Sequence, residues 1–394
     1  MAINRRRFVQ TMGAGAAGAW IAGRGLEGGL WPELAAMQGT SGAAAVSPII
    51  LSSNENPVGP GKVVLDAVRA ALGASGGPAG RYSNAAGALT EAIAKKFGVK
   101  PENVALGCGS TQLLRSSTHL FTGPTKALVA TIPAYEECAG YADMMGHPVR
   151  AVPLGPDLKM DLDKLADASR GAGLVFYCNP NNPVSTYVGA RPTRDYISRV
   201  NRISPDTTIL IDEAYFDYVT DPDHATHVPL AVEDPRVLVA RTFSKAYGMA
   251  GLRLGYAIGH ADTIKKMQDL DAATGNSSLN VLAMQAGIAA IAQDPGFIAA
   301  ERARNTSSRD FTMKWFMDHG MKPADSQANF MFVNLGRPAK DFRDACAAKG
   351  VKVGRDFPPY EKTHCRISFG TMDEMQKAVV VFGEVLAKRA ETAA

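Results

Sequence analysis

Short apolar runs alternate with longer amphipathic stretches from Pro48 onward, and this alternation predicts the architecture of the chain. Runs rich in β-branched residues indicate buried strands; they are KALVATI, GLVFYCN, TTILIDEAY and RVLVARTFS. Apolar residues at helical spacing predict helices at ALTEAIAKKFG, DLDKLADASRG and NVLAMQAGIAAIAQ. Strands that alternate with helices form a mainly parallel sheet covered on both faces. We therefore predict an α/β fold.

The closing third follows a different pattern. NFMFVNLG, GVKVGRDF and CRISFGTMDEMQKAVVVFGEVLAKRA predict a few antiparallel strands and a terminal helix, which together indicate a smaller α+β domain. We predict four segments along the chain: a leader and spacer (1–45), an N-terminal segment that packs with the small domain (46–75), a large domain (76–290) and the small C-terminal domain (291–394).

The leader carries three consecutive arginines, Arg5 to Arg7, before Phe8 and a Gly/Ala-rich run too weakly apolar to span a bilayer. This layout resembles a twin-arginine export signal, with Arg5 and Arg6 as the pair. Candidate cleavage sites lie near ELAAM and in SGAAAVS, and a disordered basic tail is the alternative. We expect a protein that the twin-arginine machinery exports to the periplasm or outside the cell.

Composition narrows the classes of function. Of the 394 residues, 46% are hydrophobic and 20% charged, which is typical of a soluble globular protein with a large core. The net charge of +4 is small for this length, so no nucleic-acid partner is indicated. The five cysteines are scattered, without the spacing of a zinc site, and predict neither a metal site nor a disulfide framework.

Polar residues directly follow three predicted strands. Asn179 follows LVFYC, Asp212 follows TTILI, and Ser244 and Lys245 follow RVLVARTF. In parallel α/β sheets ligand sites gather at the carboxyl ends of the strands. We therefore expect these residues at one edge of the sheet.

Lys245 lies in RTFSKAYGMAGLRLGY, which is poor in charge until Arg253. The ordinary alternative is a surface lysine with its amine in water. A desolvated lysine amine instead forms a Schiff base with a carbonyl, and pyridoxal phosphate is the aldehyde cofactor that uses such a lysine. That cofactor needs a carboxylate at its ring nitrogen, for which Asp212 is the candidate.

A phosphate site is indicated by LGCGSTQ, where Gly107, Gly109, Ser110 and Thr111 follow a short strand and open a helix. Free backbone N–H groups at a helix start bind anions, although an ordinary turn is the alternative. Ser244 and Arg253 can add a hydroxyl and a guanidinium to the same site.

The motifs occur in an order that resembles one family, the fold type I pyridoxal-phosphate aminotransferases, in the branch of histidinol-phosphate aminotransferase. The matching strings are SSNENPVGP, RYSNA, GCGS, PAYEE, CNPNNP, DEAY, TFSKAYGMAGLRLGY, NF and RISFGT, and they cover nearly the whole chain after the leader. The resemblance implies a large seven-stranded-type α/β/α domain that binds pyridoxal 5'-phosphate and a smaller α+β domain.

The resemblance also implies roles at the cofactor. Lys245 would form the Schiff base and move protons, Asp212 would hold the ring nitrogen, and Asn179 and Tyr215 would bind the phenolic oxygen. Tyr135 would stack on the ring. The phosphate would be bound by the residues of its loop and by two residues near the lysine: Gly109, Ser110, Thr111, Ser244 and Arg253. Tyr82 would reach the phosphate from a neighbouring subunit, which implies a homodimer. Taken singly, these residues could be core aromatics or turn residues.

The implied substrate contacts are fewer. Arg366 would bind the carboxylate of the amino acid, Asn56 would order or contact the substrate-side loop, and Arg355 lies near the family's arginine for a substrate phosphate. The chain departs from that branch because Val184 and Ser185 replace the usual threonine and glycine, and because the usual proline-tyrosine lid is missing before NENP. The donor and the acceptor therefore stay open.

We predict an aminotransferase that moves an amino group between an amino acid, or an amino alcohol phosphate, and a 2-oxo acid. The alternatives are a decarboxylase of the same branch, with the same cofactor site, and a pyridoxal-phosphate-binding protein without turnover.

Overall fold

The structure, a computed structural model, describes residues 47–73, 77–274 and 279–387. The chain divides into Met1–Ser47 and a compact unit, Pro48–Ala394, and only the second is described below. The predicted export signal with Arg5 and Arg6 lies outside the described residues.

A seven-stranded sheet has the strand order β2-β8-β7-β6-β5-β3-β4 and lies in the region predicted as the large domain. Its strands are β2 (Val104–Gly107), β3 (Leu128–Ile132), β4 (Val149–Pro153), β5 (Leu174–Cys178), β6 (Thr208–Asp212), β7 (Val237–Thr242) and β8 (Gly255–Gly259). All pairings are parallel except those of β8, which runs antiparallel to β2 and β7. The predicted α/β fold is therefore confirmed, although the sequence pattern predicted neither β4 nor β8.

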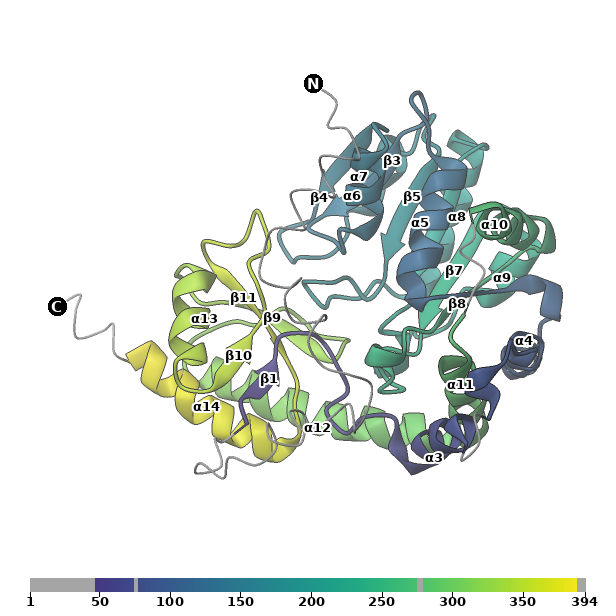
Figure 1. Cartoon of the computed structure of the whole chain (residues 1–394). Helices are drawn as coiled ribbons and strands as arrows, with labels where there is room; N and C mark the ends of the chain where they lie inside the picture. Colours follow the sequence, from purple (N-terminus) through teal and green to yellow (C-terminus); the bar gives the residue numbers. More distant parts are fainter. Residues whose placement is uncertain (1–46, 74–76, 275–278, 388–394) are drawn as a thin grey trace, which may run out of the picture. The chain divides into compact units, whose positions relative to one another are not determined.

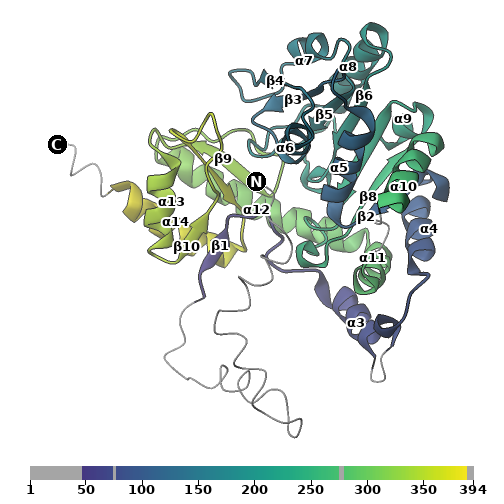
Figure 2. The ribbon, with the colours of Figure 1, turned by 45° about the horizontal axis from the view of Figure 1, so that its top comes forward.

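Both faces of this sheet are covered (Figures 1 and 2). In β5, Leu174 and Phe176 pack with the first group of helices, whereas Val175 and Tyr177 pack with the second, because successive side chains of a strand point to opposite faces. The first group is α5 (Gly109–Phe121), α6 (Glu137–Met144) and α10 (Ala261–Thr274). The second is α7 (Leu162–Ala168), α8 (Ala190–Ile203) and α9 (Val228–Glu233).

Two two-stranded sheets lie outside the seven-stranded one, in the region predicted as the small domain. β9 (Phe330–Asn334) pairs antiparallel with β11 (His364–Ser368), as predicted. The prediction of an antiparallel strand is wrong for β10 (Val351–Val353), which pairs in parallel with β1 (Ile49–Leu51). Figure 1 shows the purple β1 beside β10. Leu51 explains this pairing, because it is fully buried in one apolar cluster with Val351 and Val353. The helices here are α12 (Gly296–Asp318), α13 (Ala339–Ala347) and α14 (Met372–Ala387).

The segment 46–75 contacts more than the small domain. After β1, helix α3 (Gly61–Leu72) packs against α11 (Val281–Gln293), as does α4 (Ala85–Phe97). Four short 3-10 helices complete the elements: η1 (Pro78–Gly80), η2 (Pro101–Asn103), η3 (Phe216–Tyr218) and η4 (Ala250–Leu252). Among the described residues no single helix has the length and apolar composition to cross a membrane; α11 and α12 meet those criteria only together, across an 84° bend.

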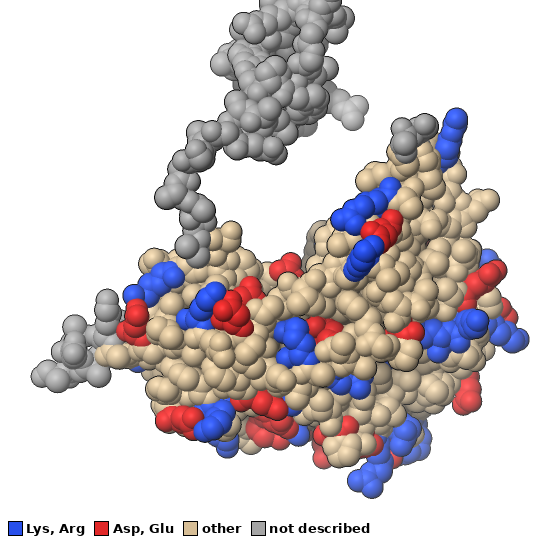
Figure 3. Space-filling model, turned by 90° about the horizontal axis from the view of Figure 1, so that it is seen from below, with Lys and Arg blue, Asp and Glu red and all other residues tan. Residues whose placement is uncertain are grey.

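Charged side chains of both signs are interspersed on the face of the molecule that Figure 3 shows. A mixed pattern of this kind produces no strong field of one sign on that face. Elsewhere in the described residues, ion pairs form within one helix, such as Lys314 with Asp318 in α12 and Lys377 with Asp373 in α14.

Candidate active site

A cavity of about 280 Å³ opens at the edge of the sheet where β6 and β7 end. Most of the predicted site residues line it: Ser110, Thr111, Tyr135, Asp212, Tyr215, Ser244, Lys245, Arg253, Arg355 and Arg366. The expectation that the strand ends bring these residues together is therefore confirmed for this set. Four predicted site residues do not line the cavity: Gly109, Asn179, Asn56 and Tyr82.

Lys245 lies in the loop after β7 with its amine inside the cavity. Its Nζ donates to the Ser53 carbonyl at 3.2 Å and lies 5.6 Å from the centre of the Tyr215 ring. Burial and, to a smaller extent, the nearby Arg366 guanidinium together lower the pKa of Lys245 to about 8. A lysine with this pKa has a substantial fraction of neutral, nucleophilic amine near neutral pH.

Asp212 ends β6 and is 3% exposed. Its Oδ1 accepts a hydrogen bond from the Ala214 N–H at 3.1 Å, and the Cys178 thiol lies 4.0 Å from Oδ2. Burial raises the pKa of Asp212 to about 7, against the opposing effects of the Ala214 N–H and Lys245. A cationic ring nitrogen beside this carboxyl would restore its negative charge, so the site suits a pyridinium.

An anion site is built at the first turn of α5. Gly109 has φ +69°, and a Cβ atom there would lie 2.4 Å from Nη2 of Arg253. Only glycine therefore lets the guanidinium approach this turn, whose backbone N–H groups lack partners within the helix. Arg253 Nη1 also donates to Ser244 Oγ at 3.3 Å and to the Ala250 carbonyl at 2.9 Å. This donor set fits a phosphate group, so Gly109 serves the site without lining the cavity.

Arg366, on β11, is 7% exposed and contacts only neutral groups through its guanidinium hydrogen bonds. Nη1 donates to Asn182 Oδ1 at 2.7 Å, and Nη2 donates to the Ser52 carbonyl at 2.6 Å. Its buried Nε has no hydrogen-bond partner among the described residues. A buried guanidinium without a carboxylate partner is suited to bind the carboxylate of a ligand.

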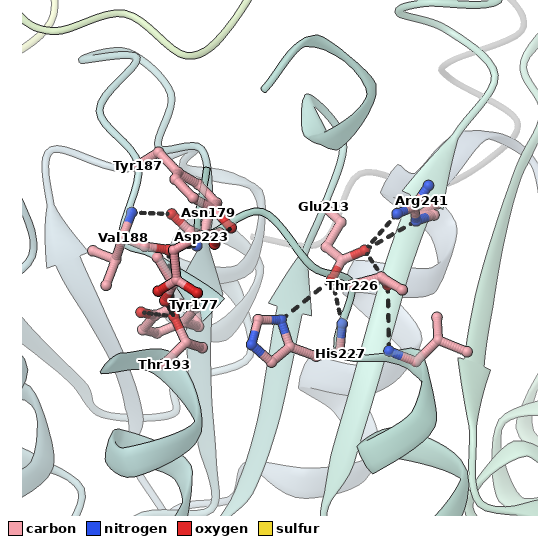
Figure 4. Close-up of polar contacts among 12 residues, drawn as sticks. Tyr177, Asn179, Tyr187, Val188, Thr193, Glu213, Asp223, Thr226, His227 and Arg241 are labelled. Atoms are coloured by element: carbon pink, nitrogen blue, oxygen red, sulfur yellow. Dashed lines mark hydrogen bonds and ion pairs between the residues drawn. The ribbon is translucent and has the colours of Figure 1, made fainter. Parts of the chain in front are cut away.

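The cofactor role predicted for Asn179 needs correction. Its side-chain amide donates to the Val188 carbonyl at 2.8 Å, and its Oδ1 accepts from the Val188 N–H at 2.9 Å (Figure 4). Its backbone N–H continues the sheet by donating to the Asp212 carbonyl. The cavity is lined instead by Asn182, the asparagine directly before the second proline of NPNNP. Both asparagines directly precede a proline, so the sequence carried no signal that distinguishes them.

Two asparagines of the NENP segment have separate roles. Asn56 lies outside the cavity, and its amide donates to the Ala246 carbonyl at 3.0 Å beside the lysine, so it orders the lysine loop rather than lining the site. Sequence reasoning missed Asn54, which lines the cavity with φ +55°. Its Nδ2 donates to the Tyr215 hydroxyl at 3.2 Å, and its Oδ1 accepts from Ser368 Oγ at 2.8 Å. Asn54 therefore orients Tyr215.

Tyr82 and Arg355 lie at the periphery. The side chain of Tyr82 is fully exposed and does not reach the cavity of its own chain. Arg355 lines the mouth, where its guanidinium pairs with Glu136. Tyr135, next to Glu136, faces the cavity, and burial raises the pKa of its hydroxyl.

Glu213, the residue after Asp212, is the centre of a buried ionic cluster (Figure 4). Glu213 accepts from Arg241 Nε and Nη2 at 3.0 and 2.8 Å, from the Thr226 hydroxyl and from the His227 backbone N–H. Burial alone would raise the pKa of Glu213, but Arg241 and His227 lower it to about 2. Its negative charge contributes to the raised pKa of the neighbouring Asp212.

Metal chemistry has no candidate within the described ranges, where no group of three His, Cys, Asp or Glu side chains is placed to hold an ion. All five cysteines are free, and only Cys108 is exposed.

Residues 46–382 match the family model of aminotransferase class I and II. The chain is 34% identical to a histidinol-phosphate aminotransferase of Moorella thermoacetica over 86% of each chain. It is also 34% identical to an aromatic amino acid aminotransferase of Streptomyces avermitilis, over 79% of this chain and 85% of that protein. The crystal structure of histidinol-phosphate aminotransferase from Sinorhizobium meliloti in complex with pyridoxal-5'-phosphate superposes with a TM-score of 0.78 at 26% identity, covering 87% and 92% of the two chains.

The chain therefore belongs to the aminotransferase class I and II family. It is an enzyme, a pyridoxal-phosphate-dependent transaminase, with the fold of the fold type I aminotransferases. The predicted fold, enzyme class and cofactor are confirmed.

The pKa of Lys245 offers a direct test of the site's electrostatics. In the cofactor-free protein we expect the Lys245 amine to titrate near pH 8, so that it is neutral above this pH and becomes protonated as the pH falls through it. Arg366→Met should raise this pKa, because a nearby positive charge is removed. NMR of ¹³C-methylated lysines, with Lys245→Ala to assign the signal, measures both values. A Lys245 signal that titrates with the exposed lysines near pH 10.4 would contradict the assignment.

Proposed function

We propose that this aminotransferase accepts an amino acid as donor and a 2-oxo acid as acceptor in two half-reactions at the Lys245 cavity. The observation that carries the proposal is the placement of a lysine of lowered pKa and an arginine without a carboxylate partner in one cavity. Lys245 can move a proton at the α-carbon of a bound substrate, while Arg366 holds its carboxylate.

Each remaining residue of the cavity has a task that follows from its position. Pyridoxal phosphate, when bound, supplies the electron sink for the carbanion. Arg253, Ser244 and Ser110 would hold its phosphate, and Asp212 would keep its ring nitrogen protonated. Tyr215, oriented by Asn54, and Asn182 present a hydroxyl and an amide to the cavity.

The cavity restricts the side chain of the amino donor less than it restricts the donor's carboxylate. The two relatives at 34% identity are named for histidinol phosphate and for aromatic amino acids, so identity alone favours neither. Arg366 is supported by the Phe357 ring, 4.6 Å from the guanidinium carbon, and the Tyr135 ring lines the same cavity. These rings favour donors with a planar or apolar side chain, and an amino alcohol phosphate would present its phosphate to an arginine instead.

Lys245→Ala tests the function itself. We expect this variant to remain folded and to bind the cofactor noncovalently, with turnover reduced by about 10⁴-fold or more, because both the covalent link and the proton carrier are lost. The measurement is the change in cofactor absorbance when amino donors are added one at a time, followed by a 2-oxo acid. Turnover at the wild-type rate in Lys245→Ala would refute the assigned role.

Arg366→Met serves as the matched comparison in that assay. It should raise KM for amino acids by about 10²-fold, the effect of losing a charged hydrogen bond of about 3 kcal/mol, and spare simple amines. An equal loss for both donor types would mean that Arg366 is structural.

We also propose that the protein is a homodimer with shared active sites. Exposed large hydrophobic residues concentrate in the N-terminal part of the described chain: Ile50, Val58, Val63, Leu65, Leu72 and Tyr82. An apolar concentration of this kind fits an interface between subunits, and Tyr82 would then reach the phosphate site of the partner.

The shared site predicts complementation between two inactive variants. Lys245→Ala lacks the lysine in both sites of its dimer, and Tyr82→Ala lacks the tyrosine in both. A hybrid dimer has one site with both native residues, so coexpression with two affinity tags should recover part of the activity. Activity of the purified hybrid no higher than that of the two parents would exclude a shared site.

Finally, we propose that the twin-arginine route exports the folded enzyme. The support is the Arg5-Arg6-Arg7-Phe8 string, together with a family match that begins only at residue 46. Replacing Arg5 and Arg6 by lysine should move a C-terminally tagged protein from the envelope fraction to the cytosol, since that route reads the arginine pair. Finding the wild-type protein only in the cytosol, with its N-terminus intact, would refute export.

A further inference from the structure

The mouth of the cavity carries an ion pair between two distant parts of the sequence. Glu136 immediately precedes α6, and Arg355 follows β10. Arg355 Nη2 donates to both carboxylate oxygens of Glu136, at 2.6 and 2.7 Å. The two side chains are 58% and 51% exposed, so the pair is open to water and to an entering ligand.

Arg355 is held close to Arg366. The N–H of Gly354 donates to the Arg366 carbonyl at 2.8 Å, and a Cβ atom on Gly354 would lie 2.6 Å from that oxygen. The ring of Phe357 lies 4.4 Å from the guanidinium carbon of Arg355 and 4.6 Å from that of Arg366. Two guanidinium groups therefore contact one ring and line one cavity, the inner one without a carboxylate partner and the outer one with Glu136.

This difference between the two arginines bears on which side chains a donor can carry. A donor whose α-carboxylate binds Arg366 has its side chain available to the rest of the cavity, including the mouth at Arg355. A negatively charged side chain would compete with Glu136 for Arg355, whereas a neutral one leaves the pair intact. Exposed ion pairs are weak and are screened by salt, so the competition is reversible.

We propose that Glu136 is a specificity-determining residue: it is an internal counter-ion that occupies Arg355 and has to be displaced by donors with an anionic side chain. The inference rests on the proposed function for the binding of the donor carboxylate at Arg366. Glu136 thereby biases the cavity toward neutral side chains without excluding anionic ones.

Binding of two non-reacting acids tests this with the cofactor-loaded enzyme. Glutarate has the two carboxylates of an anionic donor, and pentanoate has one. In Glu136→Gln, glutarate should bind about 2- to 5-fold more tightly by isothermal titration calorimetry, while pentanoate binding stays unchanged. Glu137→Gln is the matched control, because Glu137 is the next residue and lines the same outer pocket as Glu136 and Arg355, but its ion pair, at 2.5 Å, is with Arg115.

Arg355→Gln should weaken glutarate selectively, and the double variant Glu136→Gln/Arg355→Gln should bind glutarate as Arg355→Gln does. The proposal is overturned if Glu136→Gln changes both acids equally, weakens glutarate, or strengthens glutarate even when Arg355 is absent. The same gain in Glu137→Gln would also overturn it, since the effect would then be general electrostatics.

Turnover of glutamate and norvaline by the same variants separates this inference from the proposed function. If the wild-type enzyme turns over no amino acid, the proposed function fails, while the binding ratio still tests Glu136. If turnover is normal and the binding ratio does not change in Glu136→Gln, only the role of Glu136 fails.

Discussion

The segment from Ser52 to Asn56 holds two buried cations of the active site with neutral oxygen atoms, and the rest of the site depends on this arrangement. The Ser53 carbonyl accepts a hydrogen bond from Lys245, and the Ser52 carbonyl accepts one from Arg366. Carbonyl groups satisfy N–H donors without cancelling their charge. The Lys245 and Arg366 donors are therefore satisfied without an ion pair, although the carboxyl groups of Glu55 and Asp212 line the same cavity. A ligand with a phosphate and a carboxylate matches the charge of the cavity's lysine and arginines.

The two cations respond differently to their shared environment. Burial, and after it the Arg366 charge, lowers the pKa of Lys245 to about 8, so the lysine can lose its proton near neutral pH. The guanidinium of Arg366 keeps its proton at any physiological pH, although burial lowers its pKa too. The titratable cation is thus suited to nucleophilic and proton-transfer chemistry, and the permanent cation to holding an anion. The same environment produces both roles because the two side chains differ in basicity.

The sequence predicted most of the fold and the site, and the failures have identifiable physical causes. The alternation of strands and helices is a local pattern, so it could be predicted from the sequence. Parallel pairing of β6 with β7 then brings Asp212 and Lys245 to one edge of the sheet. The pairing of β1 with β10 could not be predicted from local sequence, because it depends on the burial of Leu51 among residues from the C-terminal part of the chain.

The asparagines show the same limit on a smaller scale. Asn179 continues the hydrogen bonding of the sheet, whereas Asn182, three residues later, lines the cavity. Asn54 reaches Tyr215 only because its backbone adopts a left-handed conformation. The residue type does not determine whether an asparagine side chain faces the cavity. The path of the loop in the folded protein determines it.

Two glutamate–arginine ion pairs of the site differ in burial, and this difference gives them different roles. Glu213 and Arg241 are both almost fully buried, so breaking that pair would leave an uncompensated charge at a cost of about 3–5 kcal/mol. Glu136 and Arg355 are more than half exposed, and opening such a pair costs at most about 1 kcal/mol. The buried pair can only be permanent, and it holds the strand ends behind Asp212. The exposed pair can open at little cost, as the proposed displacement of Glu136 by an anionic side chain requires.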